Sequence, residues 1–151
     1  MIQAILIFNN TGTPRLMQWY IQLPVNIQQD VLKKVFKLVS SRPKSSSNFI
    51  STNLISLSDI KLIYRSYATL FFVFIVDSNE SELGILDLIQ IFVEALDRLF
   101  TNVCELDFVF RVEEISYLLA EIVSGGLVLE TNIIEIMAAN EAKRIKKEAR
   151  F

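Results

Sequence analysis

The chain has 151 residues, a formal net charge of −2 at pH 7, and a composition that is 52% hydrophobic but only 21% charged. Because average globular chains are about 45–50% apolar and about 25% charged, this composition excludes extensive disorder and favours burial of apolar surface beyond the chain's own core. The slight acidity argues against a nucleic-acid-binding surface, and the longest uncharged apolar run, Ala68–Val76, is too short for the roughly 20 residues of a membrane-spanning helix.

The first half of the chain predicts strands around one helix. Ile2–Phe8 is a continuous apolar run followed by turn residues, which is typical of a buried strand. A second strand is predicted over Arg15–Leu23, because Pro24 cannot donate to a ladder. Apolar residues at helical spacing predict a helix over Asn26–Ser40, followed by a Ser-rich loop. Three further strands are predicted at Phe49–Asn53, Ile60–Tyr67 and Thr69–Val76.

The second half predicts helices. Asn79 with Glu82 three residues later predicts a capping box, and the helix that follows runs to about Phe100. Two further helices are predicted, and we assign no role to the tail that follows them. Their ranges are Glu105–Val123, with a break near Phe110 and a stop at Gly125 and Gly126, and Ile133–Lys147, capped by Thr131 or Asn132. Strands followed by helices predict an α+β fold, with residues 1–151 as a single domain and 133–151 as a carboxy-terminal helix and tail.

The helix over Leu83–Phe100 is apolar on most of its surface. Its polar residues form one narrow stripe and leave two apolar faces. One face is expected to pack on the sheet, and the other is covered either by Glu105–Val123 or by another protein, since monomers rarely expose large apolar patches. The spacing alone leaves these two alternatives open.

Groups for catalysis are scarce. The chain has no histidine, which removes Ser-His-Asp and Cys-His schemes and most zinc sites. Cys104 is the single cysteine, so it forms no internal disulfide, which suits a reducing cytosol, and we expect it to be a buried small residue. The four glycines do not form a phosphate-binding loop. We therefore expect no enzyme activity and no cofactor or metal.

The segment "LIYRSYATLFFVFIVD", Leu62–Asp77, resembles the signature of the sigma (small) subunits of heterotetrameric clathrin-type adaptor complexes. Further matches, in order along the chain, are "PRLMQWY" from Pro14, "FVEALDRLFTNVCELDFVF" from Phe92 and "GGLVLETN" from Gly125. The segment "VDSNESELGILDLIQ" together with "GGLVLETN" resembles most closely the sigma chain of the third adaptor complex, which is built on a delta large chain. The loop at 42–58 and the tail beyond 132 match loosely, and we assign them no role.

This resemblance implies a longin-like fold with an antiparallel sheet of about five strands flanked by helices. It implies that the large, delta-type chain is a constitutive partner, and that beta and mu chains complete the heterotetramer. It also implies a non-catalytic coat subunit in vesicle-mediated transport from Golgi and endosome toward the lysosome or vacuole. Such a subunit is cytoplasmic, lies on the cytosolic face of Golgi, endosome and vesicle membranes, and reaches the membrane and an Arf-type GTPase only through the complex.

Sigma subunits of this kind bind acidic dileucine signals, [DE]xxxL[LI], on cargo tails. Two adjacent leucines need two apolar pockets, whose filling contributes about 1.5–3 kcal/mol each before ordering costs. Carried over by motif position, the signal-binding residues are Ala68, Leu70, Val93, Asn102, Val103 and Phe108, with Arg15 facing the acidic residue of the signal. From helical spacing alone, Val93, Val103 and Phe108 are equally consistent with a structural core.

Two other functions compete with this one. A longin-type trafficking regulator would bind a SNARE or a small GTPase outside an adaptor complex, and it would be soluble as a monomer. A hydrolase would need an acid–base pair in a cleft, which the lack of histidine disfavours.

Overall fold

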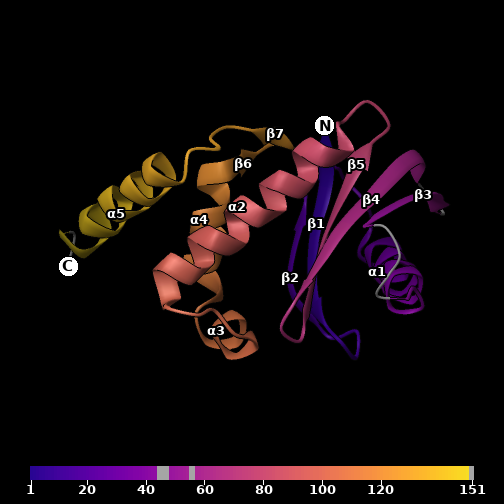
Figure 1. The fold of residues 1–151 in the computed structure, drawn as a ribbon, viewed down its shortest axis with the longest axis horizontal. Coiled ribbons are helices and arrows are strands. Elements are labelled where there is room, and N and C mark those ends of the chain that lie inside the picture. The colour runs from indigo at the N-terminus through magenta and orange to yellow at the C-terminus, as the bar shows by residue number, and fades with distance from the viewer. Residues whose placement is uncertain (44–47, 55–56, 150–151) are drawn as a thin grey trace. The chain divides into compact units, whose positions relative to one another are not determined.

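The computed structural model describes residues 1–43, 48–54 and 57–149 (Figure 1). The predicted loop at 42–58 and the end of the predicted tail therefore lie partly outside the described residues. The strands are β1 (Ile2–Asn9), β2 (Pro14–Trp19), β3 (Phe49–Leu54), β4 (Leu57–Tyr67), β5 (Leu70–Asp77), β6 (Val123–Ser124) and β7 (Leu127–Val128). The helices are α1 (Val25–Ser40), α2 (Glu82–Phe100), α3 (Glu105–Phe110), α4 (Val112–Ile122) and α5 (Ile133–Ala149).

Five strands form one antiparallel sheet in the order β2-β1-β5-β4-β3, which confirms the predicted α+β fold. β1 and β5 lie in its interior and are apolar on both faces, as expected of strands that are covered on both sides. The predicted strand over Arg15–Leu23 is shorter than expected, because the ladder of β2 ends at Trp19. One more hydrogen bond, from Tyr20 N to Gln3 O at 2.9 Å, continues the pairing beyond it.

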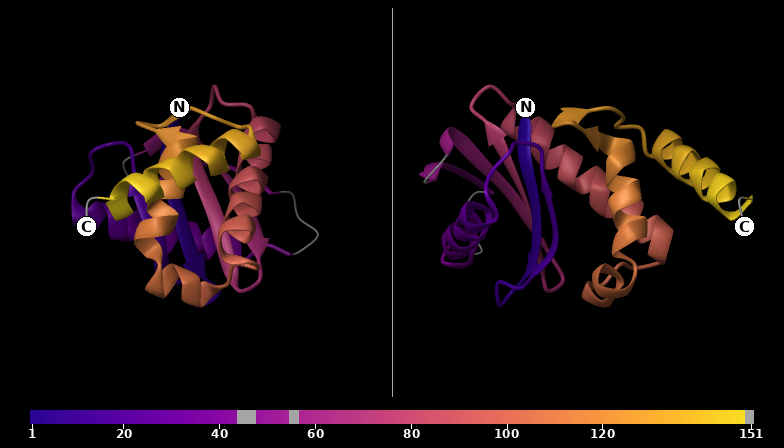
Figure 2. Two further views of the ribbon diagram at one scale, coloured as in Figure 1. Left: turned by 90° about the vertical axis from the view of Figure 1, so that its left-hand side faces the viewer. Right: turned by 180° about the vertical axis from the view of Figure 1, so that it is seen from behind.

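Helix α1 covers one face of this sheet (Figure 2). Its buried residues Val31, Val35 and Val39 pack in one cluster with alternate residues of β1, β4 and β5. At the edge of the cluster the ring of Phe36 meets Phe8 edge-on, with centroids 5.7 Å apart. The first turns of α2 lie on the opposite side of the sheet from α1 (Figures 1 and 2). The amphipathic period that predicted α1 is thus satisfied by the sheet itself.

The chain divides into two compact units, Met1–Ile89 and Gln90–Phe151. The first contains the sheet, α1 and the start of α2, and the second contains the rest of α2 and all later elements. The single-domain assignment for residues 1–151 stays a prediction.

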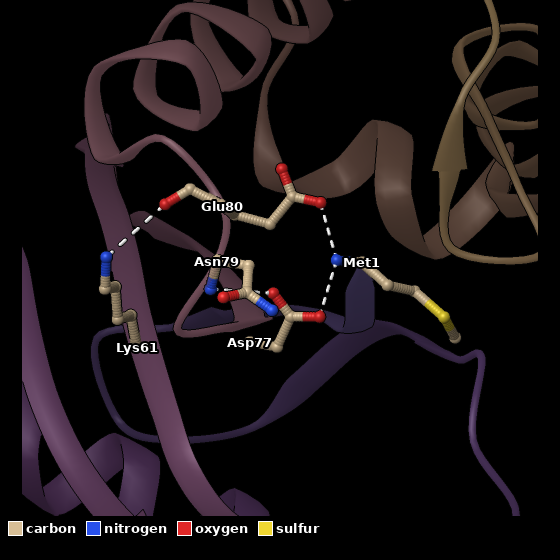
Figure 3. Close-up of polar contacts among 5 residues, drawn as sticks. All are labelled: Met1, Lys61, Asp77, Asn79 and Glu80. Carbon is tan, nitrogen blue, oxygen red and sulfur yellow. Dashed lines mark hydrogen bonds and ion pairs between the residues drawn. The ribbon is translucent and has the colours of Figure 1, made fainter.

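Helix α2 begins later than its predicted capping box. Ser81 is the N-cap, and its Oγ accepts a hydrogen bond from Gly84 N at 3.2 Å. Asn79 instead belongs to the preceding turn, where its N–H donates to Asp77 Oδ1 at 3.1 Å (Figure 3). The prediction of Asn79 as N-cap is therefore wrong. Both residues are good caps, and the turn that closes on Asp77 decides between them.

Both predicted apolar faces of α2 are largely buried in the single chain. Its buried residues are Ile85, Leu88, Ile89, Phe92, Val93, Ala95 and Leu96. Leu83, assigned to one of these faces, is 69% exposed because it lies in the first turn. Of the two predicted alternatives, burial within the chain itself therefore accounts for most of the apolar side chains of α2.

The segment after α4 is a hairpin rather than the predicted helix stop at Gly125 and Gly126. β6 and β7 pair through Val123–Val128 and Ser124–Leu127, and the turn between them is Gly125-Gly126. Both glycines have positive φ, 58° and 86°, as a two-residue hairpin turn of this kind requires. α4 itself ends at Ile122, before the glycines. The predicted break near Phe110 is confirmed as the junction between α3 and α4.

The predicted cap of α5 is confirmed, whereas the predicted burial of Cys104 is wrong. Asn132 does cap α5, since its Oδ1 accepts hydrogen bonds from Ile134 N at 3.0 Å and Glu135 N at 3.4 Å. Cys104 was expected to be buried, but it is exposed. It occupies the N-cap of α3, where its N–H donates to Asp107 Oδ2 at 2.9 Å, and a cap position at a helix start faces solvent.

Candidate functional site

One end of the sheet in the first unit brings together the predicted site residues of that unit. β4 and β5 are joined by a two-residue turn, Ala68-Thr69, with Tyr67 paired to Leu70. Leu70 also pairs with Asn9 at the end of β1, and β2 begins at this same end. Ala68 is exposed and has φ 54°, a left-handed conformation that a small residue tolerates in a tight turn. Leu70 is 1% exposed.

Arg15 lies at a bulge in the β1–β2 ladder. The register pairs Ile7 with Leu16 but Phe8 with Pro14, so it skips Arg15. A bulge of this kind bends a strand and re-aims a side chain. β2 lies two strands from β5, and neighbouring strands are about 4.8 Å apart, which places Arg15 on the order of 10 Å from Leu70 along the sheet end. The side chain is half-buried.

The predicted site residues of the second unit lie on α2, on the loop after it and on α3. Thr101 and Asn102 both have positive φ, 52° and 69°, and end α2 with a sharp turn. Val103 N donates to Asp97 Oδ1 at 3.0 Å, which fixes this loop to the last turns of α2. The capping bonds at Cys104 then start α3 immediately, so the position of Val103 is fixed from both sides.

These residues differ in exposure. Val93, Val103 and Phe108 are 3%, 4% and 1% exposed, whereas Asn102 is exposed. Of the seven predicted residues, Arg15, Ala68 and Leu70 belong to the first unit and the other four to the second. Within each unit the predicted residues come from neighbouring elements. The assignment of all seven to one signal-binding site stays a prediction.

The structure also contains a cavity that the sequence did not indicate. It lies within the second unit, between the end of α2, the start of α4 and α5, and its volume is about 830 Å³. Its lining residues are Leu99, Phe110, Arg111, Val112, Glu113, Glu114, Tyr117, Asn140, Lys143 and Arg144. The sequence signal for this cavity was the pair Phe110 and Tyr117, two large apolar residues that lie among charged residues in the chain. They are 78% and 50% exposed.

The cations around this cavity are already paired. Arg111 donates to Glu114 at 2.6 Å, and its guanidinium lies 4.5 Å above the ring of Phe100. The hydrogen bond to Glu114 raises the pKa of Arg111 above its ordinary value, with smaller contributions from the charges of Glu114 and Asp107. Lys143 forms an ion pair with Glu121 of α4, and Arg144 pairs with Glu141 at 2.7 Å. Among the described residues that line the cavity, each of the three cations therefore already has a carboxylate partner.

Within residues 1–43, 48–54 and 57–149 no group of three or more acidic or cysteine side chains is arranged to hold a metal ion. Among the helices described, none is both long enough and apolar enough to cross a membrane.

Comparison with known proteins gives a consistent result. Residues 1–146 match the family model described as clathrin adaptor complex small chain. The AP-3 complex subunit sigma-2 of Homo sapiens is 57% identical over 149 residues, which cover 97% of this chain and 77% of that protein. The AP-3 complex subunit sigma of Schizosaccharomyces pombe is 56% identical over 149 residues, covering 97% and 90%.

A structural comparison points the same way. One chain of a structure described as "Homology model of the full-length AP-3 complex in a stretched open conformation" matches with a TM-score of 0.76 and 42% identity, covering 99% of this chain and 97% of that one. The predicted resemblance to sigma subunits of the third adaptor complex is thereby confirmed. On the extent of the family match and on the identity to these relatives, the chain belongs to the clathrin adaptor complex small chain family.

Proposed function

We propose that this chain is the non-catalytic sigma subunit of an AP-3-type adaptor complex, in which it stabilises a delta-type large chain and binds acidic dileucine signals of membrane cargo. The observation that carries the proposal is 57% identity, over 97% of the chain, to a sigma-2 subunit of AP-3. The complex would include beta and mu chains and would act on the cytosolic face of Golgi, endosome and vesicle membranes, routing cargo toward the lysosome or vacuole.

The distribution of exposed apolar side chains supports a large-chain partner. In the described residues they concentrate in the second unit, on α3, α4, β7, the residue after β7, and α5. They are Leu106, Val109, Phe110, Tyr117, Leu127, Val128, Leu129, Ile134 and Ile145. Isolated surface apolar residues are normal, but this density in one small unit is typical of a subunit that assembles with other chains. The apolar faces of α2, by contrast, are largely buried, with Leu83 exposed.

The chemistry of the predicted site residues supports dileucine recognition. Val93, Val103 and Phe108 supply apolar side chains, and Asn102 is an exposed amide at a tight turn that can hydrogen-bond to an extended peptide. Arg15 supplies a cation at the sheet end for the acidic residue of the signal. Because the three apolar residues are nearly closed to solvent, the site must open before two leucines can enter.

Co-expression with the amino-terminal part of a delta-type large chain tests the proposed assembly. We expect the chain alone to be poorly soluble and to become soluble and monodisperse in a one-to-one complex on size-exclusion chromatography. A gamma-type or alpha-type large chain, from a different adaptor complex, is the matched control and should rescue less. A stable, monodisperse monomer with no affinity for the large chain would instead favour the longin-type regulator.

A further inference from the structure

The loop between α2 and α3 is held by two aspartates of the second unit. Val103 N donates to Asp97 Oδ1 at 3.0 Å, and the next amide along the chain, Cys104 N, donates to Asp107 Oδ2 at 2.9 Å. Asp97 lies in the last turn of α2, and Asp107 lies in the first turn of α3. Two consecutive backbone N–H groups are therefore fixed by carboxylates from the helices on either side of the loop.

The backbone of the same loop is strained. Thr101 and Asn102 have φ of 52° and 69°. Asparagine tolerates this left-handed region, but a β-branched residue such as threonine rarely adopts it, because its side chain crowds the backbone. A strained backbone persists only where the surrounding contacts fix it, and the hydrogen bonds to Asp97 and Asp107 are contacts of this kind.

Asp97 anchors the loop to the side of α2 that carries Val93. The two residues are four apart, so their side chains lie one turn from each other on one face of the helix. The bond to Asp97 brings the backbone of Val103 to this face, where the Val103 side chain is 4% exposed. Val93 and Phe108 are 3% and 1% exposed. Two leucines cannot enter among side chains buried to this degree unless the loop moves.

We propose that Asp97 is a positioning residue for signal binding, whose hydrogen bond to Val103 N holds the loop at 101–103 closed over Val93, Val103 and Phe108 and must break before a dileucine signal can bind. The inference rests on the proposed function, because it concerns how the same site opens. Asp97 does not itself touch the signal. The strain of the loop opposes closure and the Asp97 bond favours it, so their balance sets the fraction of chains whose pocket is open.

Removing the carboxylate shifts this balance toward the open state. In Asp97→Ala the Val103 N–H loses this acceptor in the closed loop, whereas in the open loop it can donate to water. Because the Asp97 side chain is only half-buried, we expect the opening equilibrium to change by about three- to tenfold. A signal that binds only the open state has an apparent affinity proportional to the open fraction, so its affinity should rise by the same factor.

The test is the kinetics with which an acidic dileucine peptide binds the full chain co-expressed with its large-chain partner. In Asp97→Ala the association rate constant should rise about three- to tenfold, while the dissociation rate constant changes by less than about 1.5-fold, because the bound state lacks the Asp97 bond. Asp97→Asn keeps an oxygen acceptor, so its association rate constant should stay within about twofold of that of the unsubstituted complex.

Two further variants separate this role from a general effect on stability. Thr101→Asn should slow association about twofold, because asparagine tolerates the left-handed region and stabilises the closed loop. Asn132→Ala is the matched control, since it removes hydrogen bonds from a side chain to the backbone at the start of α5 in the same unit. It should lower the melting temperature but change neither rate constant. In the absence of peptide, the Val103 amide should exchange with deuterium about three- to tenfold faster in Asp97→Ala and at an unchanged rate in Asn132→Ala.

The proposed function and the role of Asp97 fail in different ways. No binding of the peptide to the unsubstituted complex, or equal binding when both leucines are alanine, would refute the proposed function and this inference with it. Leucine-dependent binding that is weakened or unchanged in Asp97→Ala would overturn only the role of Asp97. If Asp97→Ala does not assemble, association that is not slowed in Thr101→Asn would overturn it instead.

Discussion

Replacing Val93 with aspartate, in the complex with the large chain, distinguishes a signal-binding residue from a core residue. Val93 is 3% exposed in the free chain, and a carboxylate enclosed there without partners would cost several kcal/mol. If Val93 lines a pocket that opens, the carboxylate can stay hydrated in the open state, so the fold survives. The signal then loses the burial of one leucine, about 1.5–3 kcal/mol, which is about a 10- to 150-fold loss of affinity.

The assay is calorimetric titration with an acidic dileucine peptide, together with a melting curve of the same complex. Ala95→Asp is the matched control, because Ala95 is fully buried two residues further along α2 and therefore on a different side of the helix. It should lower the melting temperature or prevent assembly. Val93→Ala covers the case in which the aspartate variant does not assemble, and it should weaken the peptide with little loss of stability.

Two results would refute the reasoning about Val93. The first is unchanged peptide affinity in a folded Val93→Asp complex, which would remove Val93 from the site. The second is a Val93→Ala complex that melts at a lower temperature but binds the peptide as the unmodified complex does, which would make Val93 a core residue.

The remaining predictions concern charge, helix capping and pH. Arg15→Ser should lower the affinity of the complex for the acidic dileucine peptide about two- to fivefold at low salt and less at high salt, with an unchanged melting curve. An equal loss of affinity at both salt concentrations would contradict a charge contact. Ser81→Ala should destabilise the start of α2 by about 0.5–2 kcal/mol, as denaturant melts of the complex would measure, whereas Asn79→Ala should cost less. Burial alone would lower the pKa of the Met1 ammonium, but its hydrogen bonds to Asp77 and Glu80 raise it above 8.0, and the Met1 contact lowers the pKa of Asp77 below 3.8. Stability from this pair is therefore complete between about pH 4 and pH 8, falls as pH rises through the raised pKa and falls as pH drops through the lowered one. Melting temperatures of Asp77→Asn that follow the same pH dependence as those of the unsubstituted chain would contradict this.

Most of the sheet was predictable because its strands are locally unambiguous. β1 and β5 are continuous apolar runs bounded by turn residues, and both were predicted within two residues of their observed ends. α1 was predictable because Ile27, Val31, Val35 and Leu38 recur at helical spacing, and Val31 and Val35 are buried. In these elements, local pattern and tertiary burial agree.

Other elements were less predictable. Their boundaries depend on contacts between residues far apart in the sequence, or on which of several suitable turn residues forms the turn. Asn79 and Ser81 are equally good caps in the sequence, and only the turn at Asp77 distinguishes them. Gly125 and Gly126 suit a helix stop and a hairpin turn alike, and strand pairing selects the hairpin. No local pattern predicts that the Met1 amino group meets Asp77 and Glu80, because they are 76 or more residues apart.

The site residues were proposed from resemblance rather than from local pattern. Apolar spacing alone cannot tell whether Val93, Val103 and Phe108 form a core or an openable pocket, since both require the same side chains. Burial in the free chain does not separate the two readings either, because a closed pocket and a core are equally dry. Only ligand binding distinguishes them.

Photo-crosslinking tests the central claim most directly. A dileucine peptide carrying a photoreactive analogue at its first leucine is irradiated with the assembled complex, and the crosslinked residues are mapped by mass spectrometry. The account predicts crosslinks to the segments that contain Val93, Val103 or Phe108, and to Ala68 or Leu70, all suppressed by excess unmodified peptide and absent when both leucines are alanine. Competed crosslinks confined to α1, to α5 or to another chain would contradict it.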